Sequence, residues 1–181
     1  MDAIECLLTR RSIRKFTERA VEPDRVRRLL DVLFRSPSAM DARPWSFVVV
    51  DDRAILRGLG AAMPHCEMLL EAPLGIVVCG EPGRERAPGF WPQDCSAAVQ
   101  NLLLAAHAME LGGVWIGLYP MEERVAAVRR ALAVPDAAVP FALAAMGYPA
   151  ERPAPDDRFD RARLHRNRWG REYPAAGKDQ P

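Results

Sequence analysis

The stretch from Asp94 to Leu111 constrains the fold most, because it has the pattern of a long helix with almost no polar face. Its apolar residues fall on every side of a helix: Ala97, Ala98, Val99, Leu102, Leu103, Leu104, Ala105, Ala106, Ala108 and Met109. A helix without a polar face normally lies in the centre of a core or in a subunit interface. We therefore expect it to be central to the fold or to an assembly, with Gly112-Gly113 at its end.

Further elements are predicted on both sides of this helix. Runs of apolar, β-branched and aromatic residues predict four strands, over Trp45–Val50, Leu74–Cys79, Val114–Leu118 and Val139–Met146. Helical spacing predicts helices over Asp2–Thr9, from Pro23 to about Phe34, from Arg53 to about Ala62, and over Glu122–Leu132. Proline and glycine predict loops over Ser36–Pro44 and Gly80–Pro92.

The composition excludes several classes of protein. A length of 181 residues favours one domain. Lys and Arg number 25 against 24 Asp and Glu, so charge alone gives no reason to expect a nucleic-acid partner. No apolar run approaches the ~18 residues of a membrane span, and no signal peptide is evident, so we expect a cytoplasmic location. The four cysteines are scattered, which favours buried thiols and no metal site.

Basic residues gather in two places, from Arg10 to Arg14 and from Arg152 to Arg171. Alternate side chains of an extended segment point to opposite sides, so Arg10, Ser12 and Arg14 would face one way together. Such a set suits a phosphate, because hydrogen bonds to a charged group contribute roughly 1.5–3 kcal/mol each. The alternative is a basic helix terminus favoured by the helix dipole. These residues alone leave both interpretations open.

The chain changes character at Ala150, where proline and arginine become frequent and apolar residues sparse. Its spaced apolar residues are Phe159, Leu164, Trp169 and Tyr173. So few apolar side chains cannot form a core of their own. We expect residues 150–173 to lie across another surface as an arm, and residues 174–181 to form a disordered tail.

Five motifs, in this order, resemble the nitroreductase family of flavin enzymes over residues 2–170. They are Arg10–Phe16, Pro37–Trp45, Asp94–His107, Gly112–Gly117 and Arg161–Trp169. The resemblance implies an α+β fold, with a central, mostly antiparallel sheet flanked by helices. It also implies an intertwined homodimer with two FMN sites at the interface, with the helix at Asp94–Leu111 as the seam and the arm lying on the partner subunit.

The resemblance also assigns site residues. One subunit would contact the FMN of a site through Arg10, Arg11, Ser12 and Arg14, and the other through Pro37, Ser38, Ala39, Met40 and Arg43. The flavin ring would be lined by Trp115, Ile116 and Gly117, and the phosphate would be held by Arg161 and Arg163. Arg14 is a candidate for tuning the flavin. Substrate-binding candidates are Asp41, His65, Phe90 and Trp91, the last two being alternatively core anchors.

Asp41 and Arg43 depart from the family, which commonly has Asn and Gln at these positions. A carboxylate cannot donate a hydrogen bond to the flavin ring, so either Arg43 compensates or the two side chains pair with each other.

The implied activity is a ping-pong reaction, in which NADH or NADPH reduces flavin N5 and a nitroaromatic, quinone or similar acceptor is reduced in turn. Because the flavin performs the chemistry, no catalytic side chain is required. The alternatives are a dehalogenating or flavin-fragmenting branch of the same fold, a non-catalytic dimer that binds or delivers flavin, and an anion or nucleic-acid binding module.

Overall fold

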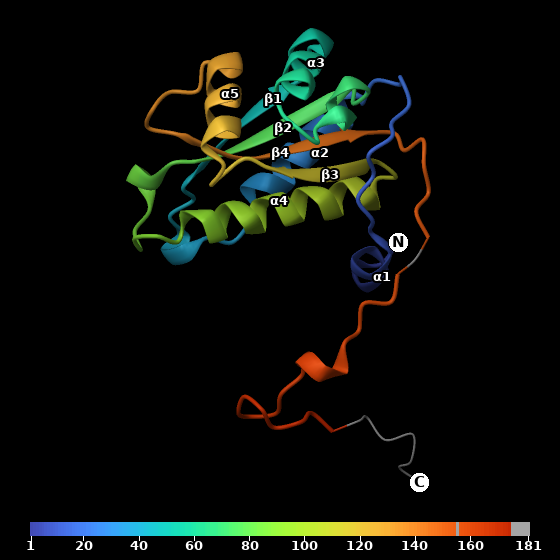
Figure 1. The fold of residues 1–181 in the computed structure, drawn as a ribbon, viewed down its shortest axis with the longest axis vertical. Helices are drawn as coiled ribbons and strands as arrows, with labels where there is room; N and C mark the ends of the chain where they lie inside the picture. Colours follow the sequence, from blue (N-terminus) through green and yellow to red (C-terminus); the bar gives the residue numbers. More distant parts are fainter. Residues whose placement is uncertain (155, 175–181) are drawn as a thin grey trace.

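A four-stranded antiparallel sheet forms the centre of the computed structural model, which describes residues 1–154 and 156–174 (Figure 1). Its strands are β1 (Trp45–Val50), β2 (Leu74–Gly80), β3 (Gly112–Gly117) and β4 (Val139–Gly147), in the order β1-β2-β4-β3. The two central strands are almost completely buried, as their continuous apolar runs predict. The predicted α+β fold with an antiparallel sheet is confirmed.

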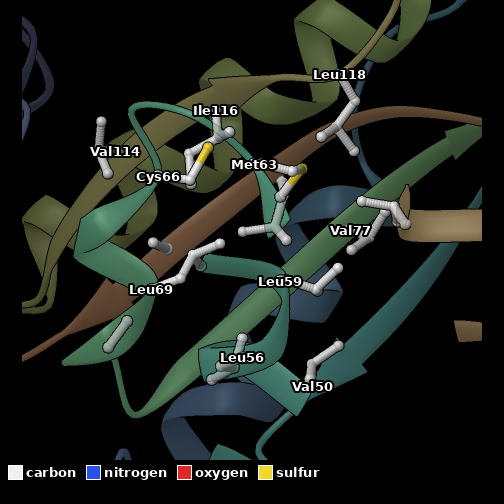
Figure 2. Close-up of a cluster of buried hydrophobic side chains, with 14 of the residues drawn as sticks. Val50, Leu56, Leu59, Met63, Cys66, Leu69, Val77, Val114, Ile116 and Leu118 are labelled. Carbon is white, nitrogen blue, oxygen red and sulfur yellow. The ribbon is translucent and has the colours of Figure 1, made fainter. Parts of the chain in front are cut away.

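The chain has five α-helices in the described residues. They are α1 (Ala3–Thr9), α2 (Pro23–Phe34), α3 (Arg53–Ala62), α4 (Trp91–Ala108) and α5 (Glu122–Leu132), with short 3₁₀ turns at Ala39–Asp41, Glu67–Leu70, Pro82–Arg84 and Arg161–Arg163. Four of these helices cover the two faces of the sheet, while α1 packs beside α4. One apolar cluster joins α2 and α4 to one face, and a second joins α3, α5 and the turn after α3 to the other. Figure 2 shows the second cluster, in which Leu56 and Leu59 of α3 point at Val50 and Val77 of the sheet.

The helix α4 begins three residues earlier than its apolar pattern predicts. The carboxylate of Glu85 accepts hydrogen bonds from the backbone N–H groups of Gly89, Phe90 and Trp91, at 3.0–3.1 Å. These bonds satisfy donors that the start of a helix leaves free. The helix ends at Ala108, because Glu110 adopts a left-handed backbone (φ 61°) and Leu111 N–H reaches back to the Ala106 carbonyl.

Only one side of α4 is covered in the described chain. Its inner face is buried in the cluster with α2, whereas Gln93, Gln100 and Ala108 on the outer face are exposed. Next to it, α1 leaves three apolar side chains largely exposed, namely Ile4, Leu7 and Leu8. An exposed apolar area of this kind marks an interaction surface.

The strand β3 begins at Gly112, two residues before its predicted start, because Gly112 and Gly113 pair with β4, and the segment 10–16 lies along their other side. Ser12 pairs with Gly113, and Ile13 N–H donates to the Gly113 carbonyl at 3.1 Å. A Cβ atom at Gly112 would lie 2.7 Å from Ile13, so only glycine permits this approach.

Ala150 and Glu151 are hydrogen-bonded to the segment 10–16, whereas the chain from the turn Arg161–Arg163 to Pro174 lies beyond α1, away from the sheet (Figure 1). The predicted anchors Phe159, Trp169 and Tyr173 are exposed, Trp169 to 91%. The predicted disordered tail, apart from Pro174, lies outside the described residues. Across residues 1–154 and 156–174, no helix has the length and apolar character required to cross a membrane.

Candidate functional site

The segment 10–16 is fixed against β3 by its two apolar residues. Ile13 and Phe16 are buried in the core cluster on the α3 side. Arg14 N–H and Lys15 N–H donate to the carboxylate of Glu151, at 2.5 and 3.2 Å. The segment is therefore an ordered edge of the sheet and not a solvated charge run, and its arginines have a defined place.

A cluster of guanidinium groups lies at the start of this segment. Arg10 is half-buried, and burial lowers its pKa, with Arg158 and Arg11 lowering it further. The Nη1 atom of Arg10 and the Nε atom of Arg11 are buried without a hydrogen-bond partner among the described residues. Because like charges repel and buried donors need acceptors, this cluster is suited to an anion.

Arg158 was not among the predicted site residues. It is brought to the cluster by the chain around Asp156, whose carbonyl accepts from Arg11 Nη2 at 3.2 Å. Asp156 also pairs with Arg158 through its carboxylate, at 2.9 Å. The only signal in the sequence was the density of arginines between residues 152 and 171, which does not distinguish one arginine from another.

Arg161 and Arg163 have partners within the arm. Arg161 lies 3.4 Å from Glu172, and Arg163 lies 2.9 Å from Asp160. Both arginines are exposed, and their short turn lies beyond α1 from the sheet (Figure 1). A single chain thus brings Arg158 to Arg10, and the convergence of Arg161 and Arg163 on the same site stays a prediction for a pair of chains.

The loop Ser36–Pro44 is the second half of the predicted site. Met40, Asp41 and Arg43 all have left-handed backbone angles, with φ between 49° and 53°. For residues other than glycine, this conformation costs of order 1–3 kcal/mol each and persists only where the surroundings enforce it. Such strain is typical of functional loops.

Asp41 and Arg43 pair with each other, the second of the two expected alternatives. Arg43 donates through Nε and Nη2 to the two carboxylate oxygens of Asp41, at 2.7 and 2.9 Å. This pair lowers the pKa of Asp41, so the carboxylate is ionised and accepts hydrogen bonds only. Both side chains are exposed on the loop beside Met40.

The residues of β3 divide between the two faces of the sheet. Trp115 is half-buried and lies on the α4 side, with its ring 6.0 Å from that of Phe141. Ile116 points into the cluster on the α3 side (Figure 2). A ring bound on the α4 side would therefore meet the backbone of Ile116 and not its side chain.

The substrate-binding candidates differ in exposure. Trp91 is 8% exposed, and its ring lies 4.8 Å from Tyr119 and 5.9 Å from Phe141, as expected of a core anchor. Phe90 and His65 are exposed. Tyr119, which follows β3, is exposed beside Trp91 and was not predicted.

The two halves of the site lie at opposite ends of α4. Asp94 accepts from the loop at Ala39 N–H, at 2.9 Å. Thirteen residues further on, His107 Nε2 lies 2.9 Å from the hydroxyl of Thr9, which precedes Arg10. At 1.5 Å per residue these two attachment points are about 20 Å apart along the helix. Within one chain, the loop and the arginine cluster therefore lie too far apart to form one site.

Taken together, these features define an α+β protein with a cluster of partly buried arginines at the edge of an antiparallel sheet. The model of the family described as "Nitroreductase family" matches residues 7–63 and 61–148. The "Putative NADH dehydrogenase/NAD(P)H nitroreductase" of Methanothermobacter thermautotrophicus is 46% identical over 169 residues, which are 93% of this chain and 88% of the relative. The chain belongs to the nitroreductase family.

Solved structures agree with this assignment. A crystal structure from Parabacteroides distasonis with the same name has a TM-score of 0.88 at 38% identity, and the match covers 92% of this chain and 98% of the other. An FMN-dependent nitroreductase from Clostridium difficile has a TM-score of 0.86 at 28% identity, with 92% and 99% covered. The expected family and fold are therefore confirmed.

Proposed function

We propose that this protein is an FMN-dependent NAD(P)H oxidoreductase that works as a homodimer. The observation that carries the proposal is the half-buried guanidinium of Arg10, whose Nη1 atom has no partner among the described residues. At the edge of β3, a phosphate dianion would accept from this atom and from the Nε atom of Arg11, which also has no partner among the described residues, with Arg158 as a further cation nearby.

The residues present fit FMN. Arg10, Arg11 and Arg158 would hold its phosphate, joined by Arg161 and Arg163 once a second chain is in place. Ser12 and the exposed side chain of Arg14 lie further along the same segment. The backbone from Trp115 to Gly117 would line the ring from the α4 side.

Bound FMN would supply the redox chemistry, taking a hydride from NADH or NADPH at N5 and passing the electrons to a nitroaromatic, quinone or similar acceptor by a ping-pong sequence. The protein's part is to hold the cofactor, exclude water and place a cation near the ring. The name of the 46% identical relative includes NAD(P)H, and that of the Clostridium difficile structure includes FMN, which supports this choice.

The length of α4 supports the homodimer. If two α4 helices pack antiparallel about a two-fold axis, the Ser36–Pro44 loop of one chain comes beside the arginine cluster of the other. The seam would cover the exposed outer face of α4 and the apolar residues of α1, which lie next to it. Two complete flavin sites would then form, each from both chains.

The arm completes this assembly. Residues 1–173 form one FMN-binding domain in our proposal, and residues 150–173 lie on the partner subunit. Phe159, Trp169 and Tyr173 are exposed in the described chain and would be buried there. Such an exchange would also account for an arm that leaves the body of its own chain (Figure 1).

The absorbance spectrum of the purified protein tests the proposal. We expect a yellow protein, or one that becomes yellow with FMN, and loss of the visible flavin band on anaerobic addition of NADH or NADPH. A nitroaromatic or quinone should then restore the band. A protein that binds FMN but is not bleached by either nicotinamide would be a flavin carrier and not an oxidoreductase.

A further inference from the structure

The carboxylate of Asp94 is buried beneath the Ser36–Pro44 loop. It is 6% exposed and lies in the first turn of α4, where the helix dipole favours negative charge. Its Oδ1 atom accepts from Ala39 N–H at 2.9 Å, and its Oδ2 atom has no hydrogen-bond partner among the described residues. A buried carboxylate is costly, so a residue that keeps one for a single backbone hydrogen bond calls for an explanation.

The strain in the loop supplies that explanation. Met40 and Asp41, directly after Ala39, and Arg43 have left-handed backbones, which the residue types of methionine and arginine do not favour. Ala39 N–H is the last point at which the loop is held before the strained residues. The Asp94 carboxylate therefore sets where they begin.

A second hydrogen bond from α4 holds the start of the loop. Asn101 donates from Nδ2 to Ser36 Oγ at 3.1 Å, and Ser36 is buried. Asp94 and Asn101 are seven residues apart, which places them on one face of α4, two turns from each other. The helix α4 is thus hydrogen-bonded to the loop at two points, Ser36 and Ala39, which fix the position of the loop relative to the helix.

We propose that Asp94 is a positioning residue that shapes the Ser36–Met40 loop for the flavin site formed with the partner chain. This inference rests on the proposed function. In that arrangement, each flavin site is formed by the loop of one chain and the arginine cluster of the other chain. In a dimer with Asp94 changed in one chain only, the site formed with the partner's arginine cluster should therefore be damaged. The other site should stay intact.

Two single substitutions give the first test. Asp94→Asn keeps an oxygen that accepts from Ala39, whereas Asp94→Ala leaves that N–H without a partner. We expect Asp94→Ala to raise the Kd for FMN at least about tenfold, and Asp94→Asn to raise it much less. Asp31→Ala, at an exposed aspartate of α2 outside the proposed seam, is the matched control. An Asp94→Ala protein with wild-type affinity for FMN would overturn the inference and leave the proposed function standing.

Heterodimers made with two affinity tags give the decisive test. With Asp94→Ala in one chain and Arg10→Ala in the other, both changes fall on one site, and one FMN per dimer should remain. With both changes in one chain, each site carries one defect, and almost no FMN should bind at the same concentration. Equal flavin content in the two heterodimers, or the opposite order, would refute a positioning role across the interface. Failure of wild-type protein to bind FMN at all would refute the proposed function instead.

Discussion

Arg10 owes its role to its surroundings more than to its charge. Arginine is common in this chain, but Arg10 combines partial burial, an unpartnered nitrogen and two cationic neighbours. From the sequence, the alternation of side chains gave an anion site at Arg10 as one of two interpretations, beside a basic helix terminus. The burial of Ile13 and Phe16 fixes the segment that carries Arg10.

Replacing Arg10 with alanine should weaken FMN binding without unfolding the protein. Loss of a charge-assisted hydrogen bond of roughly 1.5–3 kcal/mol corresponds to about a 10- to 150-fold higher Kd. Lys15→Ala, in the same segment and exposed, is the control. Titration of the apoproteins with FMN, followed by fluorescence quenching, measures both constants. Equal affinities for the two variants would remove Arg10 from the site.

The imidazole of His107 should make the stability of the apoprotein depend on pH. It donates to Thr9, because the Thr9 hydroxyl gives its own hydrogen to the Glu5 carbonyl at 2.6 Å. Burial, then Arg10 and Arg11, lower the pKa of His107 below its ordinary 6.5, against an opposing effect of Glu5. The folded state binds the proton less readily than the unfolded state. Its stability is therefore full above pH 6.5 and falls as the pH drops through the folded pKa.

His107→Gln should flatten this dependence, since glutamine can still donate to Thr9 but does not titrate. Thermal unfolding midpoints of both proteins between about pH 7.5 and pH 5 provide the measurement. Parallel profiles for the wild type and the variant would show that another group controls the acid side.

The contacts of some individual residues could not be predicted from the sequence. The pairing of Asp41 with Arg43 could be stated only as one of two alternatives, because the choice depends on a backbone conformation that the sequence does not encode locally. Arg158 was missed for a similar reason: its approach to Arg10 depends on the path of the arm around Asp156. Ile116 was placed along the ring without regard to which face of β3 it occupies.

The helix α4 organises the molecule at the scale of elements. Its inner face belongs to the core of its own chain, and its two ends hold the two halves of the site. The apolar pattern predicted a central helix, and the structure separates that pattern into a core side and an open side. Ala98, on the core side, is fully buried, whereas Ala97 on the next face is only half-buried.

Ala97→Glu should therefore dissociate the proposed dimer and leave the monomer folded. A carboxylate in a closed apolar seam would lose its water without gaining a partner, which costs several kcal/mol. Ala54→Glu, on the exposed side of α3, should have no effect on assembly. Sedimentation velocity distinguishes the two proteins, with circular dichroism as the check on folding. A dimeric Ala97→Glu protein would place the seam elsewhere.

Most elements could be predicted because their boundaries depend on local residues. The strand β1 and the helix α5 have the predicted limits, set by β-branched runs, helical spacing and flanking prolines or acidic residues. The start of α4 was missed because its capping carboxylate, Glu85, comes from six residues upstream of Trp91. The start of β3 was missed because Gly112 was interpreted as the end of the preceding helix. In the structure, its missing side chain leaves room for Ile13.

At the scale of the whole molecule, the described chain looks like half of an assembly. It leaves an open face on α4, an apolar face on α1 and an arm whose Phe159, Trp169 and Tyr173 are exposed. Composition and periodicity favoured an arm that lies on another surface over one that dangles, but did not indicate which surface. We expected a partner subunit because of the resemblance to the nitroreductase family. The separation of the two half-sites along α4 gives a physical reason for a second chain.

Sedimentation of the FMN-loaded protein, recorded in the ultraviolet and at the visible flavin band, tests a flavin site built from two chains most directly. We expect the flavin to sediment with a species of twice the chain mass, at two FMN per pair of chains. Flavin that travels with single chains, or that stays behind while the protein sediments, would contradict it.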